Sequence, residues 1–356
     1  MNEALSKLAD DFFKNTLNSS PTSAIMRGYR EYFDQIEELT EARFDQNLKD
    51  LDKFEKRLNE IDFNNLSNKE KVTHGMLEYA FGSNKDSLLD KSWEFGAGVS
   101  GFTGYLIDYN QQMFIPDLES ADLLLKRLEL YNQFFNQVSL VQKKGLDGNR
   151  VATERNLLRT IDQIESYLKT SLEEDPLLLV NFSPEVSEED VINWKEKAKL
   201  IIDGYVRPSV NTYLEQLKSE HLPKGRSDMN PGIMWIEGGD DIYLRSLRKF
   251  TGNKDITVQQ VHETGLSEIK RLKKEFLEIG KKVFKDVTTP EEVIYKMQTE
   301  PSMRFESKEQ MLQMAEDTIK RAYEPLADWF TVFPKAPCNV LPVPEESEKH
   351  LSLIHI

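Results

Sequence analysis

The sequence has a single cysteine and no excess of basic charge. Cys338 cannot form an internal disulfide, and alone it cannot build a cysteine-ligated zinc or iron–sulfur site. The 46 basic side chains are outnumbered by 61 acidic ones, which gives a formal net charge of −15. A nucleic-acid binder needs a basic surface that displaces counterions from the phosphates. We therefore expect no nucleic-acid partner, and the acidity favours solubility and, at most, attraction for basic peptides or cations.

Long apolar runs are also lacking. No segment approaches the roughly 18 consecutive apolar residues of a membrane-spanning helix. The first residues, MNEALSKLADDFF, do not have the basic and then apolar pattern of a signal peptide. As written, the sequence predicts a soluble, cytoplasmic protein without a membrane span, and export stays open if residues precede Met1.

Turn residues are sparse, with 17 glycines and 14 prolines, which favours few long elements over many short strands. Apolar residues recur at spacings of three and four, the pattern of amphipathic helices. The predicted fold class is therefore all-α. The clearest apolar stripes run through residues 44–61, 121–138, 157–168, 191–205 and 258–279. A capping Ser or Thr followed three residues later by Glu or Gln marks the start of a helix. This pattern occurs at Ser67 with Glu70, Thr289 with Glu292, and Ser307 with Gln310.

The domain organisation follows from length and from the lack of a linker. At roughly 150 residues per domain, 356 residues suggest about two domains or one large one. No stretch is long, polar and of low complexity, as an interdomain tether would be. Prolines such as Pro116, Pro208 and Pro325 mark breaks, kinks or short connections between helices. We predict a single large multi-helix body.

A glycine-rich segment, Gly96 to Gly101 with Gly104 behind it, matches the letters G-x-G-x-x-G. That pattern binds a dinucleotide only between a strand and a helix, where the backbone approaches a pyrophosphate. No such unit surrounds this segment. We interpret it as a glycine-rich loop, which can still border a ligand cleft because loops often carry function.

Three side chains are candidates for substrate binding. His262 and Glu263 begin like the zinc motif H-E-x-x-H, but the position four residues on is Leu266, so no metal site is expected in this segment. His262 is expected to be partly buried, with contact to a substrate as the alternative. Tyr243 and Arg245 follow an acidic glycine turn and have groups that bind a peptide carbonyl or carboxylate. Tyr243 is nevertheless expected to form a buried helix stripe with Leu247 and Phe250, and substrate binding is the alternative.

Three segments together resemble a known family. They start at Ala9 (ADDFFKNTLNSSPTSAIMRGYREYFD), at Gly238 (GGDDIYLRSLRKFTGNKDITVQQVHETGLSEIKRLKKEF) and at Ala322 (AYEPLADWFTVFPKAPCNVLPVPEESEK). The family is the bacterial domain of unknown function 885, a set of helical proteins that resemble zinc-dependent metallopeptidases. His262, Gly265, Leu266 and Glu268 fall on its Ile/Val-His-x-x-Gly-Leu-x-Glu motif.

The resemblance implies a helical, zincin-like peptidase with a peptide-sized cleft and zinc as the cofactor of the full-length protein. The family's His-Glu-x-x-Pro-Gly-His motif, with the metal ligands and the general base, is expected beyond the last matched segment. Residues 1–350 are therefore interpreted as the N-terminal portion of a metal-dependent hydrolase. This portion is expected to supply scaffold helices and part of a cleft, and to be inactive by itself. The alternative is a non-catalytic helical scaffold or binding protein whose acidic faces engage a basic partner.

The last six residues, 351–356, read LSLIHI and differ in character from the charged segment before them. They are also the translation of CTG TCT CTT ATA CAC ATC, which resembles the adaptor of transposase-based sequencing libraries. We therefore expect this tail to be non-native and leave it out of the fold prediction. The alternative is a genuine apolar C-terminus.

Overall fold

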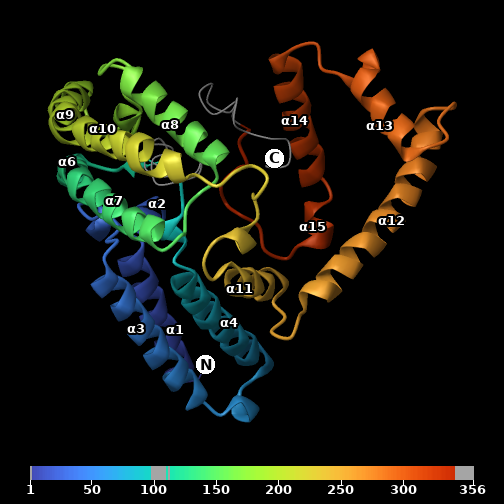
Figure 1. The fold of residues 1–356 in the computed structure, drawn as a ribbon, viewed down its shortest axis with the longest axis horizontal. Helices are drawn as coiled ribbons and strands as arrows, with labels where there is room; N and C mark the ends of the chain where they lie inside the picture. The colour runs from blue at the N-terminus through green and yellow to red at the C-terminus, as the bar shows by residue number, and fades with distance from the viewer. Residues whose placement is uncertain (1, 98–109, 111–112, 341–356) are drawn as a thin grey trace. The chain divides into compact units, whose positions relative to one another are not determined.

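The computed structural model describes residues 2–97, 110 and 113–340. Almost all of its regular elements are helices (Figure 1), so the predicted all-α class is confirmed. The chain divides into two compact units, Met1–Ile256 and Thr257–Ile356. The sequence pattern predicts no boundary at this position, which falls in the short connection before a helix capped by Thr257.

The first unit contains most of the helices and one short pair of strands. Phe114–Ile115 (β1) and Asn181–Phe182 (β2) pair in parallel, with Phe114 opposite Asn181. The α-helices of its described residues are α1 (Glu3–Ser19), α2 (Pro21–Met26), α3 (Glu41–Asn59), α4 (Asn68–Asp90), α6 (Leu118–Glu129), α7 (Tyr131–Asp147), α8 (Glu154–Lys169), α9 (Glu188–Ile201), α10 (Arg207–Gln216) and α11 (Gly239–Thr251).

Two hydrophobic clusters hold this unit together. The smaller one joins α1, α3 and α4, where Leu8, Leu58 and Phe81 are almost completely buried. The larger one joins α2 and α6 to α10, and it includes Leu128 and Leu157. Full burial of one such side chain stabilises the fold by about 1.5–3 kcal/mol. The apolar stripes predicted in this unit therefore supply most of its core, although the stripe at residues 121–138 spans two helices that meet at Leu130. The exception is Tyr205, at the end of the stripe 191–205, which lies on a π-helical turn and is 50% exposed.

The predicted helix starts are confirmed because capping is a local interaction. The backbone N–H of Ser67 donates to the Glu70 carboxylate over 2.9 Å, which completes a reciprocal capping box at the start of α4. Thr289 and Glu292 form the same arrangement at the start of α13 (Pro290–Thr299). Ser307 accepts a hydrogen bond from the Gln310 backbone over 3.2 Å.

Proline 208 does not interrupt the chain's helical path, in contrast to the predicted break. The residues from Glu188 to Gln216 stay helical, and α9 and α10 are joined by a π-helical turn, η5 (Ile202–Val206). In a π turn the hydrogen bonds reach five residues back, and Arg207 donates from its backbone N–H to the oxygen of Ile202. The missing N–H of Pro208 comes just after this change of register, so the helix accommodates it.

The second unit is built from four helices with little buried surface. Among its described residues, only Gly280, Val287 and Val293 are buried. A Cβ atom at Gly280 would lie 2.4 Å from the Val293 side chain, so glycine permits the close packing of the first two helices. The helices are α12 (Val258–Val283), α13 (Pro290–Thr299), α14 (Lys308–Tyr323) and α15 (Leu326–Trp329).

Candidate functional site

Two adjoining hollows follow α7 in the first unit, and we call them together the α7 groove. A cavity of about 250 Å³ lies between the end of α1, the segment Asp34–Glu38 and α7. A more open hollow of about 440 Å³ continues along α7 to Tyr205. Leu130, Gln133 and Gln137 line both. The other lining residues are Asn18, Ser19, Pro21, Arg43, Glu129, Asn132, Phe134, Asn136 and Leu140.

Side-chain amides dominate the part of the groove that α7 contributes. The local sequence is Asn132-Gln133-Phe-Phe-Asn136-Gln137, in which an Asn-Gln pair recurs after four residues. The two phenylalanines are 2% exposed and lie in the larger cluster. With 3.6 residues per turn, burial of the two rings places both amide pairs on the opposite face. The sequence therefore carries a signal for this surface in its Asn-Gln repeat, which is not a catalytic motif.

An ion pair between a buried arginine and a partly buried glutamate fixes the wall of the groove opposite α7. Glu37 accepts two hydrogen bonds from Thr22, over 2.9 Å from its backbone and 2.8 Å from its hydroxyl. Arg127, which is fully buried, lies 3.8 Å from the same carboxylate. Its guanidinium also donates to the Thr22 hydroxyl and to the main-chain oxygen of Gln35. The wall segment is thus attached to α2 and α6 by charge-assisted hydrogen bonds.

Two further contacts set the position of this wall. The backbone N–H of Leu39 donates to Oε1 of Gln137 over 2.8 Å, which ties the wall directly to α7. The Tyr32 hydroxyl donates to Asn18 over 2.6 Å at the end of α1. Tyr131 lies beside Arg127, and burial raises the pKa of Tyr131 to about 12, so its hydroxyl stays protonated at neutral pH. The wall is therefore preorganised before any ligand arrives.

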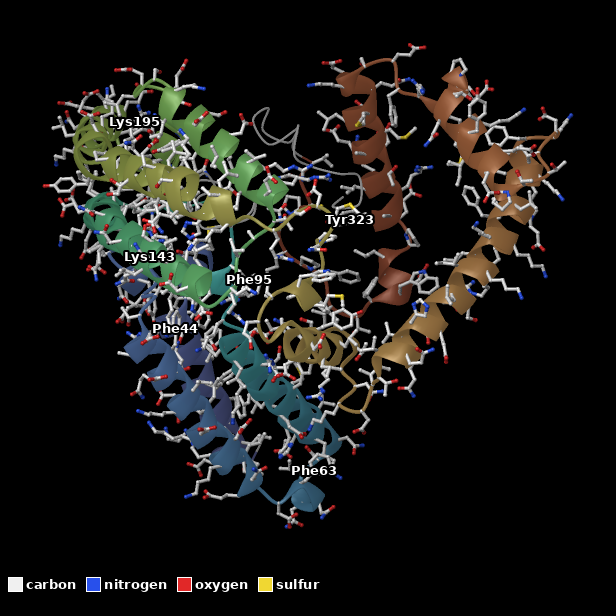
Figure 2. The ribbon with its side chains drawn as sticks, viewed as in Figure 1. Phe44, Phe63, Phe95, Lys143, Lys195 and Tyr323 are labelled. Carbon is white, nitrogen blue, oxygen red and sulfur yellow. The ribbon has the colours of Figure 1, made fainter. Side chains whose placement is uncertain are left out.

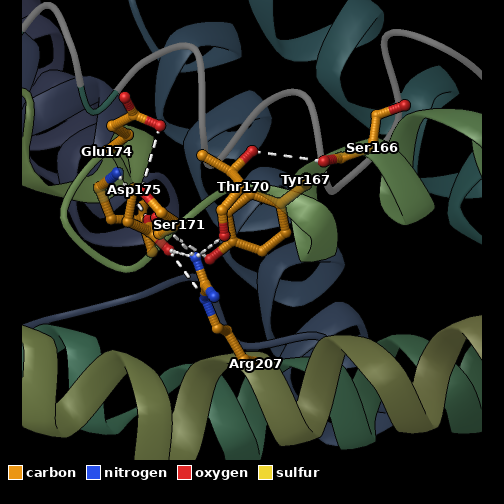
Figure 3. A network of polar contacts seen from close by, with 8 residues as sticks. Ser166, Tyr167, Thr170, Ser171, Glu174, Asp175 and Arg207 are labelled. Carbon is orange, nitrogen blue, oxygen red and sulfur yellow. Dashed lines mark hydrogen bonds and ion pairs between the residues drawn. The ribbon is translucent and has the colours of Figure 1, made fainter.

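The far end of the groove is formed by Tyr205, which lies on the π-helical turn. Two residues on, Arg207 makes bonds of 3.0 and 2.8 Å to the buried carboxylate of Asp175 (Figure 3). It also donates to the main-chain oxygen of Thr170 over 2.9 Å, so the loop after α8 is bound to the start of α10. Tyr167 packs beside this pair, and burial raises its pKa. This network anchors the turn that presents Tyr205.

The groove is equipped for binding. Its lining contains no histidine or cysteine, so it lacks the usual general base and the usual thiol nucleophile. Asn and Gln side chains instead offer paired donors and acceptors. Across residues 2–97, 110 and 113–340, no three His, Cys, Asp or Glu side chains form a metal-ligand group. The described residues do not fit the zinc ion that the resemblance implies, and we assign no reaction step to it.

The three predicted substrate-binding residues lie outside the groove lining. Arg245 pairs through Nε with Asp90 of α4, so its charge serves the packing of α11. Tyr243 is 43% exposed and Phe250 is 85% exposed. The predicted buried stripe is therefore wrong, because α11 packs against α4 and the Ile233–Trp235 turn through Ile242. His262 is exposed on α12, in contrast to the expected partial burial.

The glycine-rich segment is described only at its start. Residues 98–109, which include Gly101 and Gly104, lie outside the described residues. Just before them, Trp93 stacks on Phe44 with ring centroids 3.7 Å apart, and Arg150 lies 5.0 Å above the ring of Phe95. Phe44 and Phe95 are labelled in Figure 2. The carboxylate of Glu94 pairs with Arg150 over 2.7 Å. These contacts attach the start of the segment to α3 and to the end of α7.

The fold of this chain is similar to that of a solved structure. A solved structure described as a "putative lipoprotein" from Colwellia psychrerythraea has a TM-score of 0.81 with this chain at 16% sequence identity. The similarity covers 98% of this chain and 64% of the solved one, so the chain spans just under two thirds of that protein's length. At this low sequence identity, the TM-score shows that the two proteins share a helical fold, and no more.

The family is established independently of that fold. Residues 21–356 match the family described as "Bacterial protein of unknown function (DUF885)", and the chain belongs to it. The family predicted from the three sequence segments is thereby confirmed. No curated protein matches the sequence. Among the described residues, no helix is both long enough and apolar enough to span a membrane.

Proposed function

We propose that this chain is the scaffold and substrate-holding part of a metal-dependent peptide hydrolase. The α7 groove forms part of its peptide-binding cleft. The observation that carries the proposal is a groove with side-chain amides of α7 on one side and a wall fixed by Glu37 and the buried Arg127 on the other. Such a site can hold a polar chain in one orientation, which is what a hydrolase requires of its cleft.

In this proposal, the groups that carry out peptide hydrolysis are residues that the structure does not describe. The family resemblance implies a zinc ion held by a His-Glu-x-x-Pro-Gly-His motif, which the described residues do not contain. This chain spans 64% of the length of the solved protein of similar fold, which therefore has residues outside the matched part. By itself the chain is expected to bind peptides without cleaving them.

A cleavage assay tests the proposal. Residues 1–350 and a longer product, extended by any coding sequence that follows in the source genome, are incubated with a mixture of synthetic peptides. Each is assayed with added zinc and with a chelator, and the fragments are identified by mass spectrometry. The longer product should cleave peptides in a zinc-dependent way, while residues 1–350 should not. Zinc-dependent cleavage by residues 1–350 would contradict the assignment of the chemistry.

The second candidate is a non-catalytic scaffold that binds a basic partner, which the net charge of −15 favours. The same assay separates the two functions. An extended protein that lacks zinc-dependent cleavage, yet binds cationic peptides with an affinity that falls steeply with salt, would support the scaffold.

A further inference from the structure

We infer that the two Asn-Gln pairs of α7 form a ladder that binds the main chain of an extended peptide. This inference rests on the proposed peptide-binding role, and it names the residues and the part of the ligand that they recognise. The ladder consists of Asn132, Gln133, Asn136 and Gln137.

The spacing of the ladder matches an extended peptide. Residues four apart on an α-helix are separated by about 6 Å along its axis. Two residues of an extended chain span about 6.6 Å, and their N–H and C=O groups recur on the same side at that interval. Successive two-residue repeats of an extended peptide can therefore meet successive amide pairs of α7. The first pair is Asn132 and Gln133, and the second, one turn later, is Asn136 and Gln137.

The ladder also has free hydrogen-bonding capacity. Within the described part of the chain, the side chain of Gln133 has no hydrogen-bond partner, and Gln137 uses only its Oε1, which accepts from Leu39. Asn136 donates to Asn132 over 3.0 Å, which leaves the oxygen of Asn136 and the NH₂ of Asn132 available. Each amide can thus accept from a peptide N–H or donate to a peptide C=O.

The surroundings favour a peptide over an anionic polymer. Asp34 lines the cavity and Glu129 lines the open hollow, where they would repel phosphate groups, and the lining Arg43 is paired with Glu38 over 3.0 Å. At its open end Leu140 and Tyr205 are 68% and 50% exposed, which provides an apolar contact for a ligand side chain. Main-chain hydrogen bonds with such side contacts are a recurring mode of peptide recognition.

Binding of a synthetic peptide tests the ladder. The probe is a fluorescein-labelled (Ala-Lys)₄ peptide, followed by fluorescence anisotropy with residues 1–350. We expect Gln133→Ala and Asn136→Ala each to weaken binding about fivefold, since each removes about one hydrogen bond. The matched control is Asn193→Ala, because Asn193 is an exposed amide on α9 outside the groove. It should leave the affinity unchanged.

Methylated peptides distinguish main-chain recognition from simple charge attraction. Two versions of the probe are compared. One carries N-methyl groups on the backbone nitrogens of its alanines, and the other carries them on those of its lysines. Because only one register can face the ladder, one version should bind at least tenfold more weakly than the other. Equal binding of both versions, no effect of Gln133→Ala, or displacement by a neutral oligosaccharide would each overturn the inference.

The two proposals fail in different ways. If the extended protein cleaves peptides but Gln133→Ala leaves its KM unchanged, the ladder is wrong and the hydrolase stands. If the ladder variants weaken peptide binding but zinc-dependent cleavage is absent, the hydrolase is wrong and the ladder stands. Hydrogen exchange of α7 in each variant verifies that the helix remains folded.

Discussion

Helices α8 and α12 have the same kind of amphipathic sequence but reach different degrees of burial. In α8, of the first unit, Leu157 and Ile164 are fully buried within the larger cluster. In α12, of the second unit, Ile269 and Leu272 are 54% and 51% exposed. An apolar stripe therefore defines a helix, whereas burial depends on what packs against the stripe.

The charged residues of the two units differ in the same way. Arg127 in the first unit is fully buried, and it is held by Glu37, Thr22 and the Gln35 main chain. Arg271 in the second unit is 51% exposed and pairs along its own helix with Glu268 and Glu275. A buried ion pair fixes a tertiary wall, while an exposed one supports a helix locally.

The largest expected effect comes from removing the buried arginine. We expect Arg127→Met to lower the free energy of unfolding of the first unit by about 3–5 kcal/mol, because the partly buried Glu37 would lose its charged partner and the Thr22 hydroxyl and the Gln35 oxygen would lose a charged donor. Arg271→Met is the matched control in the second unit and should have a far smaller effect. Urea denaturation measures each loss of unfolding free energy, and hydrogen exchange shows in which unit the loss occurs. Equal losses would show that Arg271 is also enclosed in solution.

A smaller difference is expected when a leucine is shortened in each unit. Leu128 is fully buried, so Leu128→Ala should cost about 2–5 kcal/mol through lost burial and the cavity left behind. Leu272→Ala on exposed α12 should change stability by within about 0.5 kcal/mol. The readout is again the urea midpoint. A large cost at Leu272 would mean that the apolar face of α12 is covered in solution.

The smallest effect concerns two capping boxes, one in each unit. Hydrogen bonds from Ser67 lower the pKa of Glu70 to about 2, and hydrogen bonds from Thr288 and Thr289 lower that of Glu292. Each carboxylate therefore contributes stability above its unfolded pKa of 4.5 and loses it as the pH falls toward its folded pKa. In thermal melts, Glu70→Gln and Glu292→Gln should each lower the melting temperature above pH 4.5. This loss should disappear as the pH falls through the same window. Because capping is local, both units should respond alike, and a response in only one unit would contradict this.

The candidate site was only partly predictable. The glutamine and asparagine repeat at residues 132–137 is visible in the sequence, and its place opposite two buried phenylalanines follows from helix periodicity. The wall that completes the groove comes from Asp34–Glu38, about a hundred residues earlier. No local pattern links that segment to α7. The candidates Tyr243 and Arg245 were chosen for their chemical groups, but packing against α4 gave Arg245 a structural partner.

By itself the sequence determined the helical class, the family and the helix starts at Ser67, Thr289 and Ser307. Each of these depends on periodicity, local hydrogen bonds or segment similarity, which a linear pattern contains. Tertiary structure alone decided which stripes are buried, how Pro208 is accommodated and which residues form the α7 groove. The physical reason is that burial, a buried ion pair and a cavity require surfaces from distant segments to meet, and that depends on packing between elements.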